Sequence, residues 1–154
     1  CGETDAEFEL TVDAVHEYRF KNSFIFKYSE RDGTKAASRL PDDVPREVKQ
    51  QRNNALLAVQ DAISEEDNQA FLGREFEVLV EGPSKRARRN ADEGPLVQMT
   101  GRTHCDRIVV WDGNRRQEGA LLPVTIYDAT AHTLFGTVTT TEVGPDYFDL
   151  QLTN

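Results

Sequence analysis

The sequence predicts an α+β protein whose first part is helical and whose second part is a small β-barrel. In the first part, apolar residues recur at helical spacing over residues 5–18 and 45–63. From Gly73 the pattern changes to short stretches in which apolar and polar residues alternate, which is typical of strands. Because five such stretches follow within about seventy residues, we expect a five-stranded, OB-like barrel over about residues 73–140.

The first helix has a clear start. Thr4 and Glu7 have the spacing of a capping box, in which each side chain caps the other residue's backbone N–H, so the helix is expected over residues 5–18. Its apolar face is formed by Phe8, Val12, Val15 and Tyr18. This regular spacing makes the N-terminal helix a firm expectation.

A strand is expected after that helix, over residues 22–28. Its aromatic side chains alternate with an aliphatic one, in the order Phe24, Ile25, Phe26 and Tyr28. Residues 29–43 have no periodicity and are expected to form a loop. A helix followed by one strand fits the last repeat of an α/β barrel without its partner strands. We therefore expect the β-barrel to fold without residues 1–42, and poor burial for Phe8, Val12, Phe24 and Phe26.

A second helix is expected over residues 45–63. Pro45 suits a first helical turn, because its ring fixes φ near the helical value. The apolar stripe of this helix is formed by Val48, Ala55, Leu56, Val59 and Ile63. The polar run Ser64–Asn68 predicts either that the helix ends there or that a short next helix begins there.

The barrel strands are expected at Phe76–Val80, Leu96–Thr103, Ile108–Trp111, Leu121–Tyr127 and Leu134–Thr139. Between them, residues 85–94 are expected to form a charged loop without regular structure, and Asp112–Gly113 a turn. Trp111 is expected in the barrel core rather than as a platform for stacking bases. The tail from Thr140 is expected to add an edge strand or to stay loose.

Composition excludes several classes of protein. Charged residues make up 29% and hydrophobic residues 38% of the 154 residues. No apolar run is long enough to span a bilayer, and no N-terminal segment resembles a signal peptide, so a cytosolic compartment is expected. Two cysteines, Cys1 and Cys105, provide neither a disulfide framework nor the spacing of a metal or cluster site. No partner at ligand spacing accompanies His16 or His132, so no metal site is expected.

The net charge of −9 is distributed unevenly. Residues 1–72 carry −6, residues 73–141 are neutral, and residues 142–154 carry −3. Within the neutral part, cations gather in the run Lys85, Arg86, Arg88 and Arg89 and in the pair Arg115–Arg116. Such local patches decide contacts with nucleic-acid phosphates more than total charge does. The alternative is a solvated loop that binds nothing.

A second group of candidates surrounds the turn at Cys105–Asp106. Alternation places Arg102 and His104 on one face of an extended strand, which would suit phosphate contacts, and Arg107 follows the turn. The alternative is that these residues keep a sheet edge soluble. Cys105 has no base or second thiol beside it in the sequence pattern, so a structural role is favoured.

Three stretches of the chain resemble the C-terminal part of the MiaB-type radical-SAM tRNA methylthiotransferases. They are YSERDGTKAA at Tyr28–Ala37, EVLVEGPSK at Glu77–Lys85 and TGRT at Thr100–Thr103. The resemblance implies that residues 1–42 end a radical-SAM barrel, 43–72 form a helical linker, 73–141 form a TRAM β-barrel and 142–154 form a tail. It also implies that the chain is truncated at Cys1. At Glu30, Asp32 and Lys35 the chain departs from the prolines typical of the family.

The resemblance also implies a function. Members of this family use 4Fe-4S clusters and S-adenosylmethionine to add a 2-methylthio group to N6-isopentenyladenosine beside the tRNA anticodon. The cysteine motifs for the clusters are absent from this chain, so we expect it to bind no cofactor alone, to contain no catalytic residue and to be inactive alone. Its expected partner is the tRNA anticodon stem-loop, with no membrane association and a monomeric state.

Two regions carry the site residues that the resemblance implies. Gly2 and Glu3 would lie near the S-adenosylmethionine pocket. Arg31, in a loop near the barrel mouth, would pair with a phosphate or a carboxylate, or would pin the loop by contacts with backbone carbonyls. The expected tRNA contacts are Arg31, Lys85, Arg86, Arg88, Arg89, Arg102, His104 and Arg107.

Other readings of the same sequence stay open. Related methylthiotransferases act on threonylcarbamoyl adenosine or on a ribosomal protein, although the EVLVEGPSK and TGRT stretches favour the isopentenyl branch. A different class of protein would be a stand-alone RNA-binding β-barrel with a helical extension.

Overall fold

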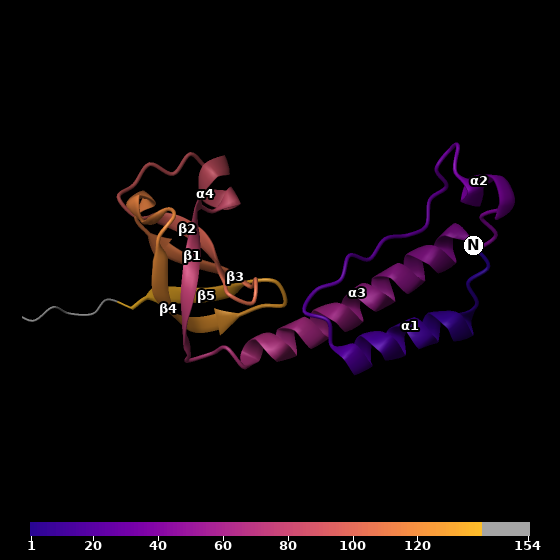
Figure 1. The fold of residues 1–154 in the computed structure, drawn as a ribbon, viewed down its shortest axis with the longest axis horizontal. Helices are drawn as coiled ribbons and strands as arrows, with labels where there is room; N and C mark the ends of the chain where they lie inside the picture. Colours follow the sequence, from indigo (N-terminus) through magenta and orange to yellow (C-terminus); the bar gives the residue numbers. More distant parts are fainter. Residues whose placement is uncertain (140–154) are drawn as a thin grey trace, which may run out of the picture. The chain divides into compact units, whose positions relative to one another are not determined.

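The computed structural model describes residues 1–139, which divide into two units (Figure 1). The N-terminal unit comprises Cys1–Phe71 together with the short segment Ala129–His132. The barrel unit comprises Leu72–Asp128 and the chain from Thr133. This division agrees with the change of sequence pattern at Gly73.

The N-terminal unit is built on the helix pair α1 (Asp5–Tyr18) and α3 (Arg46–Gln69), which lie side by side. The predicted capping box of α1 is present, because the Thr4 hydroxyl accepts from the Glu7 N–H at 3.3 Å and the Glu7 carboxylate accepts from the Thr4 N–H at 2.8 Å. Both bounds of α1 are confirmed. Its face toward α3 is closed by Val15, which is buried.

Helix α3 continues past its predicted end at Ile63, so the prediction that residues 64–68 end the helix or start a new one is wrong. The reason is that polar side chains on the second half of α3 find backbone partners. Gln60 Nε2 donates to the Phe20 carbonyl at 2.6 Å, and Ser64 Oγ donates to the Lys21 carbonyl at 3.2 Å. Polar residues can therefore be buried on this helix without loss of hydrogen bonds.

The predicted strand over residues 22–28 is wrong. Within residues 1–139, this segment is extended but pairs with no other strand. Phe24 and Phe26 are 87% and 82% exposed, and their rings stack with centroids 6.5 Å apart. A strand requires a partner for its backbone hydrogen bonds, and the described residues contain none here. Poor burial of these two aromatics is confirmed, whereas Phe8 and Val12 are half-buried.

A short helix, α2 (Lys35–Arg39), replaces part of the loop predicted over residues 29–43. Thr34 caps it by accepting the Ala37 N–H at 3.2 Å. Its sequence signal was a lone capping threonine before five residues, too short a stretch for helical periodicity to show.

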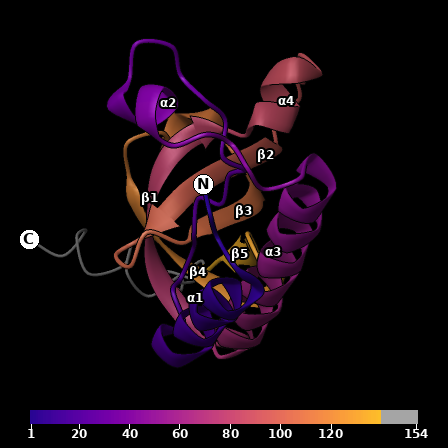
Figure 2. The same ribbon diagram turned by 90° about the vertical axis from the view of Figure 1, so that its right-hand side faces the viewer.

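The barrel unit is a closed barrel of five strands in the order β1-β2-β3-β5-β4 (Figures 1 and 2). The strands are β1 (Glu75–Pro83), β2 (Val97–Thr103), β3 (Ile108–Gly113), β4 (Leu121–Ala129) and β5 (Leu134–Val138). The β1–β2, β2–β3 and β1–β4 pairs are antiparallel, and β3–β5 is parallel. This arrangement confirms the predicted five-stranded OB-like barrel.

The barrel core is filled by the alternating apolar residues that the sequence pattern marked. Trp111 is 2% exposed, which confirms its predicted core position, and Met99, Val124 and Leu134 are fully buried. Gly101 is required where strands approach closely, because a Cβ there would overlap the Leu79 carbonyl. The core therefore depends on one strand face from each of the five strands.

Two local predictions in this unit are wrong. Asp112 and Gly113 belong to β3 and do not form a turn. Residues 85–89 of the predicted loop form a helix, α4 (Lys85–Arg89). The prediction of an edge strand in the tail from Thr140 lies outside the described residues.

Candidate nucleic-acid interface

Helix α4 is fixed to the barrel through its N-cap residue, Ser84, and its one non-basic residue, Ala87. The Ser84 hydroxyl accepts the Ala87 N–H at 3.1 Å and donates to Gln98 Oε1 of β2 at 2.7 Å. The Ser84 N–H also donates to the Gln98 carbonyl at 2.8 Å. Ala87 is fully buried. The structure therefore has a capped helix, anchored to the barrel, where the sequence predicted a loop without regular structure.

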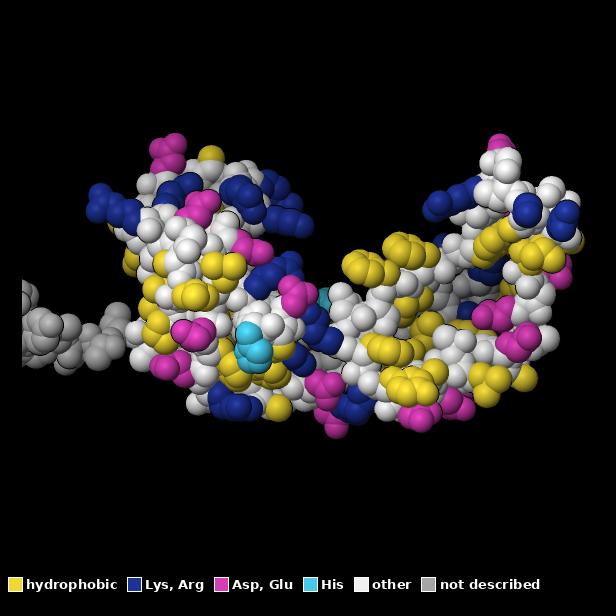
Figure 3. Space-filling view, in the orientation of Figure 1, with side chains coloured by type: hydrophobic (Ala, Val, Ile, Leu, Met, Phe, Trp, Pro, Cys, Tyr) yellow, Lys and Arg dark blue, Asp and Glu magenta, His cyan; other side chains and the backbone are white. Residues whose placement is uncertain are grey.

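All four basic side chains of α4 face solvent. The predicted contacts Lys85, Arg86, Arg88 and Arg89 are exposed, and none of them pairs with a carboxylate of residues 1–139. Figure 3 shows Lys and Arg side chains gathered around α4. Uncompensated cations on an ordered support are what binding to a phosphate backbone needs.

The other predicted cations of the barrel unit lie at the opposite end of β2. Pro83, just before α4, pairs with Met99 near the start of β2, whereas Arg102 and His104 lie at or beyond its end. Val97 and Thr103 are six positions apart along β2, a distance of roughly 20 Å. The structure therefore does not bring all predicted contacts into one surface.

Arg102 is engaged by two carboxylates. Its guanidinium donates to Glu81 at 3.0 Å and to Asp106 at 2.6 Å. The Asp106 hydrogen bond is the largest cause of a raised pKa for Arg102. His104 is exposed but lies in the turn after β2, so the predicted shared strand face with Arg102 is wrong. Of the predicted cations, those of α4 are better placed for phosphates.

Cys105 lies in the same turn, with Arg107 beside it. Arg107 Nη1 donates to Cys105 Sγ at 3.3 Å, and the Thr103 hydroxyl is 3.2 Å from the same sulfur. Burial raises the pKa of the Cys105 thiol, but these two hydrogen bonds lower it, and the net pKa lies below the ordinary value. Arg107 thus has a local partner within the turn.

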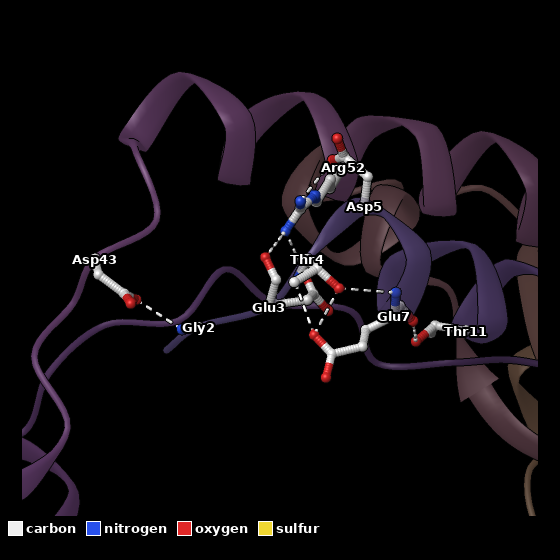
Figure 4. Close-up of polar contacts among 8 residues, drawn as sticks. All are labelled: Gly2, Glu3, Thr4, Asp5, Glu7, Thr11, Asp43 and Arg52. Carbon is white, nitrogen blue, oxygen red and sulfur yellow. Dashed lines mark hydrogen bonds and ion pairs between the residues drawn. The ribbon is translucent and has the colours of Figure 1, made fainter.

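In the N-terminal unit, the predicted cofactor-pocket residues Gly2 and Glu3 are held by side chains of other segments (Figure 4). The Gly2 N–H donates to Asp43 Oδ1 at 2.6 Å. The Arg52 guanidinium donates to Glu3 Oε2 at 2.8 Å and to Asp5 Oδ1 at 2.7 Å. The turn before α1 is therefore positioned by α3 and by the segment before it.

Sequence reasoning missed Arg52, which organises this turn. Its side chain is only 12% exposed, and its guanidinium also lies 5.7 Å from the centre of the Phe8 ring. The available signal was its spacing, because Arg52 falls four residues from both Val48 and Leu56 on the apolar stripe of α3. A cation on an apolar stripe indicates a partner on another segment of the chain.

Some of these residues also line a cavity of about 220 Å³ in the N-terminal unit. Its wall includes Glu3, Phe8, Tyr28, Lys49 and Arg52. The predicted Gly2–Glu3 turn thus borders a hollow with charged and aromatic walls, in which the Glu3 carboxylate already has a cationic partner.

Arg31 stands apart from both sites. It is exposed, and only its backbone carbonyl has a described role, accepting from Thr34 Oγ1 at 2.8 Å and from the Thr34 N–H at 3.2 Å. Its guanidinium pairs with no carboxylate of residues 1–139. Contact between Arg31 and tRNA stays a prediction.

Two further properties concern the described part of the chain. Between residues 1 and 139, no cluster of three or more His, Cys, Asp and Glu side chains is arranged to hold a metal ion. None of the helices in that range has the length and apolar character needed to cross a membrane.

A closed five-stranded barrel with an exposed basic surface is an architecture that recurs among small barrels that bind nucleic acid. Comparison with known proteins gives a more specific relationship. The chain is 63% identical, over 93% of its length, to a protein of Rhodopirellula baltica named tRNA-2-methylthio-N(6)-dimethylallyladenosine synthase. Proteins of the same name from Porphyromonas gingivalis and Methylacidiphilum infernorum are 44% and 43% identical over 92% and 88% of the chain.

These relatives are named as synthases, that is, as enzymes, and their relationship to the chain confirms the resemblance carried by its three motifs. The chain spans 30%, 29% and 27% of the lengths of these three curated relatives. It is therefore related to one part of these synthases. No family model matches the chain.

Proposed function

We propose that this chain is the C-terminal part of a radical-SAM tRNA methylthiotransferase that adds a 2-methylthio group to N6-isopentenyladenosine beside the tRNA anticodon. The observation that carries this proposal is 63% identity, over 93% of the chain, to a protein named for that product. The shared name of the relatives favours the isopentenyl branch over the threonylcarbamoyl and ribosomal-protein branches.

Within such an enzyme, the barrel unit would be the TRAM domain that holds the tRNA anticodon stem-loop. The support is the set of four exposed cations on α4, which have no ion-pair partner among residues 1–139; α4 itself is anchored to the barrel through Ser84 and Ala87. Cations held on a small barrel bind nucleic acid mainly through phosphates. A cytosolic, monomeric enzyme fits a tRNA substrate.

The cofactors of the full enzyme would be S-adenosylmethionine and 4Fe-4S clusters. Together they would supply the radical and the sulfur donation of the reaction. Clusters of this kind need several cysteine thiolates, and this chain contains only Cys1 and Cys105, which lie in different units. We therefore assign the clusters to the rest of the full enzyme. Glu3 borders the cavity of the N-terminal unit, where Arg52 would fix its carboxylate, and Gly2 precedes it in the chain.

The tRNA-binding part of the proposal is tested with the complete 154-residue chain. Affinity for an anticodon stem-loop is measured over a range of salt concentrations, for the parent and for a variant with Lys85, Arg86, Arg88 and Arg89 changed to Gln. The parent should bind weakly, and the variant should lose about 0.7 to 0.9 unit of the log–log salt slope for each phosphate contact removed.

A matched control removes four cations from the N-terminal unit, by changing Lys27, Lys35, Arg39 and Arg46 to Gln. It lowers the net charge equally but leaves α4 intact, so its salt slope should stay near that of the parent. Equal affinity and slope in the parent and the α4 variant would show that α4 is a solvated surface and that tRNA binds elsewhere.

The enzymatic part is tested by reading the gene upstream of the Cys1 codon. The proposal requires a continuous reading frame there that encodes the cysteine motifs of the clusters. A stop codon shortly before Cys1 would favour the stand-alone RNA-binding barrel instead.

A further inference from the structure

A second basic element of the barrel unit lies outside α4. The 3₁₀ helix η1 (Arg115–Gln117) carries two exposed arginines, Arg115 and Arg116. Asn114 caps it, because its Oδ1 accepts the Arg116 N–H at 2.9 Å and its own N–H donates to Gln117 Oε1 at 3.1 Å. The two arginines therefore project from a fixed turn.

Strand register places η1 and α4 at the same end of the barrel. Pro83, at the end of β1, pairs with Met99 of β2, and Met99 in turn pairs with Trp111 of β3. Helix α4 follows directly after β1, and η1 follows directly after β3. Two segments about thirty residues apart in sequence thus emerge at the same end of the barrel, from the two strands that flank β2.

A direct contact joins the two segments. The Arg115 guanidinium donates to the carbonyl of Asp92, and the Asp92 N–H donates to the carbonyl of Ala87 in α4 at 3.1 Å. Arg115 therefore ties the loop after α4 to η1. Arg116 has no ion-pair partner among residues 1–139, so its charge is available to a ligand.

The combined surface, residues 84–94 and 114–118, differs in charge from the rest of the chain. It contains six Lys and Arg residues against three carboxylates, a balance of +3 in a chain of −9. It contains no aromatic residue, and the nearby Trp111 is buried in the core. Such a surface can contact phosphates but offers no ring on which a base could stack.

We propose that α4 and η1 form one phosphate-binding surface, in which Arg115 and Arg116 add to the α4 cations and which recognises the RNA backbone rather than the base sequence. The inference rests on the proposed tRNA-binding function and deepens it. It extends the RNA contact beyond the predicted residues and assigns sequence recognition to other parts of the full enzyme.

The test uses the full chain and two anticodon stem-loops that share a secondary structure but differ in sequence. Arg116→Gln removes a charge and keeps the Arg115–Asp92 contact, so it isolates the role in RNA binding. The double change of Arg115 and Arg116 to Gln removes both charges. The salt slope should fall by about one unit per lost contact, equally for both RNAs.

Arg74→Gln is the matched control, because Arg74 precedes β1 at the other end of the barrel, over the Phe76 ring. It should leave the salt slope unchanged. Thermal unfolding followed by Trp111 fluorescence shows whether each variant is folded.

The outcomes separate this inference from the proposed function. If the α4 variant weakens binding but both η1 variants match Arg74→Gln, the joint surface is wrong and the proposed function stands. If the parent prefers one stem-loop sequence by more than tenfold, recognition of the backbone alone is wrong. If neither α4 nor η1 variants change the salt slope, the tRNA-binding role of this unit itself fails.

Discussion

The two units bury their apolar side chains to very different extents. In the barrel unit, Val78, Met99, Val124 and Leu134 are fully buried. In the N-terminal unit, Phe24 and Phe26 are more than four-fifths exposed. A closed barrel satisfies every strand with a neighbour, whereas an extended segment without a partner cannot cover its own side chains. Closure of the barrel, more than the hydrophobicity of individual side chains, therefore decides which apolar residues form a core.

Polar contacts have a larger share in holding the N-terminal unit together. Arg52 binds Glu3 and Asp5, and Arg19 binds Glu66 and Asp67, all at partly exposed positions. Ion pairs of this kind contribute little to stability, because water screens them. The N-terminal unit should therefore unfold locally at a lower free energy than the barrel.

Limited proteolysis should show the largest difference between the units. Segment 20–31 has no strand partner among the described residues, so its local opening free energy should be near zero, whereas cutting within 75–138 requires opening of the barrel. We expect cleavage in 20–31 to be at least about a hundredfold faster than in the barrel strands. Mass spectrometry of early fragments measures this order.

Deleting residues 1–42 extends the same test. The barrel should keep its unfolding midpoint, read from Trp111 fluorescence. Early proteolytic cuts within residues 75–138, with residues 5–28 protected, would show that the N-terminal unit is more stable than the barrel unit.

A cavity in the barrel core should have the next largest effect. Met99→Ala removes a fully buried side chain and should lower the free energy of unfolding by about 2–5 kcal/mol. Urea unfolding followed by Trp111 fluorescence measures it, since Trp111 is the only tryptophan of the chain. The control Leu121→Ala truncates a side chain that is 64% exposed, in the same unit. Equal losses in both variants would contradict the assigned core.

The same contrast explains what could be predicted from the sequence. The barrel strands and Trp111 followed from local alternation, because each strand shows one face to the core. Helix α1 followed from the Thr4–Glu7 capping box. These features depend on neighbours in sequence, and the structure repeats them almost residue for residue.

Two of the misses depended on contacts distant in sequence, whereas α2 and α4 were missed because each is only five residues long. Segment 22–28 has the pattern of a strand but no strand to pair with among residues 1–139. Helix α3 continues beyond Ile63, because the Phe20 and Lys21 carbonyls accept hydrogen bonds from Gln60 and Ser64. In the candidate interface, the cations of α4 were identified by composition. That α4 and η1 lie at the same end of the barrel could be seen only from the register of β1, β2 and β3, which no local sequence pattern reveals.

Acid should affect the N-terminal unit through its capping contacts. The backbone hydrogen bond with Thr4 lowers the pKa of Glu7, and the Gly2 N–H lowers the pKa of Asp43. A carboxyl group whose pKa is lower in the folded than in the unfolded state stabilises the fold at any pH above its unfolded-state pKa. This stabilisation is lost as the pH falls through the folded-state pKa. Helix signal in circular dichroism should therefore begin to fall below about pH 4.5, the ordinary value for Glu7.

Glu7→Gln keeps an acceptor for the Thr4 N–H but cannot be protonated, so the helix signal should depend less on pH. Glu9→Gln, which removes an exposed carboxylate of the same helix, controls for the loss of one charge. An identical pH profile in the parent and Glu7→Gln would show that the capping box is not the acid-sensitive contact.

The smallest expected effect concerns the Cys105 thiol, and it tests whether its surroundings matter for RNA at all. Burial raises the pKa of Cys105, but hydrogen bonds with Thr103 and Arg107 lower it below the ordinary value, so Arg107→Gln should raise it. The pH dependence of alkylation, measured in a Cys1→Ser background, reports this change. Cys105→Ser keeps a hydrogen-bonding side chain at the turn and should leave affinity for the stem-loop nearly unchanged. A clear loss of affinity in Cys105→Ser would move the RNA contact from the α4 end of the barrel to the Arg102–Arg107 end.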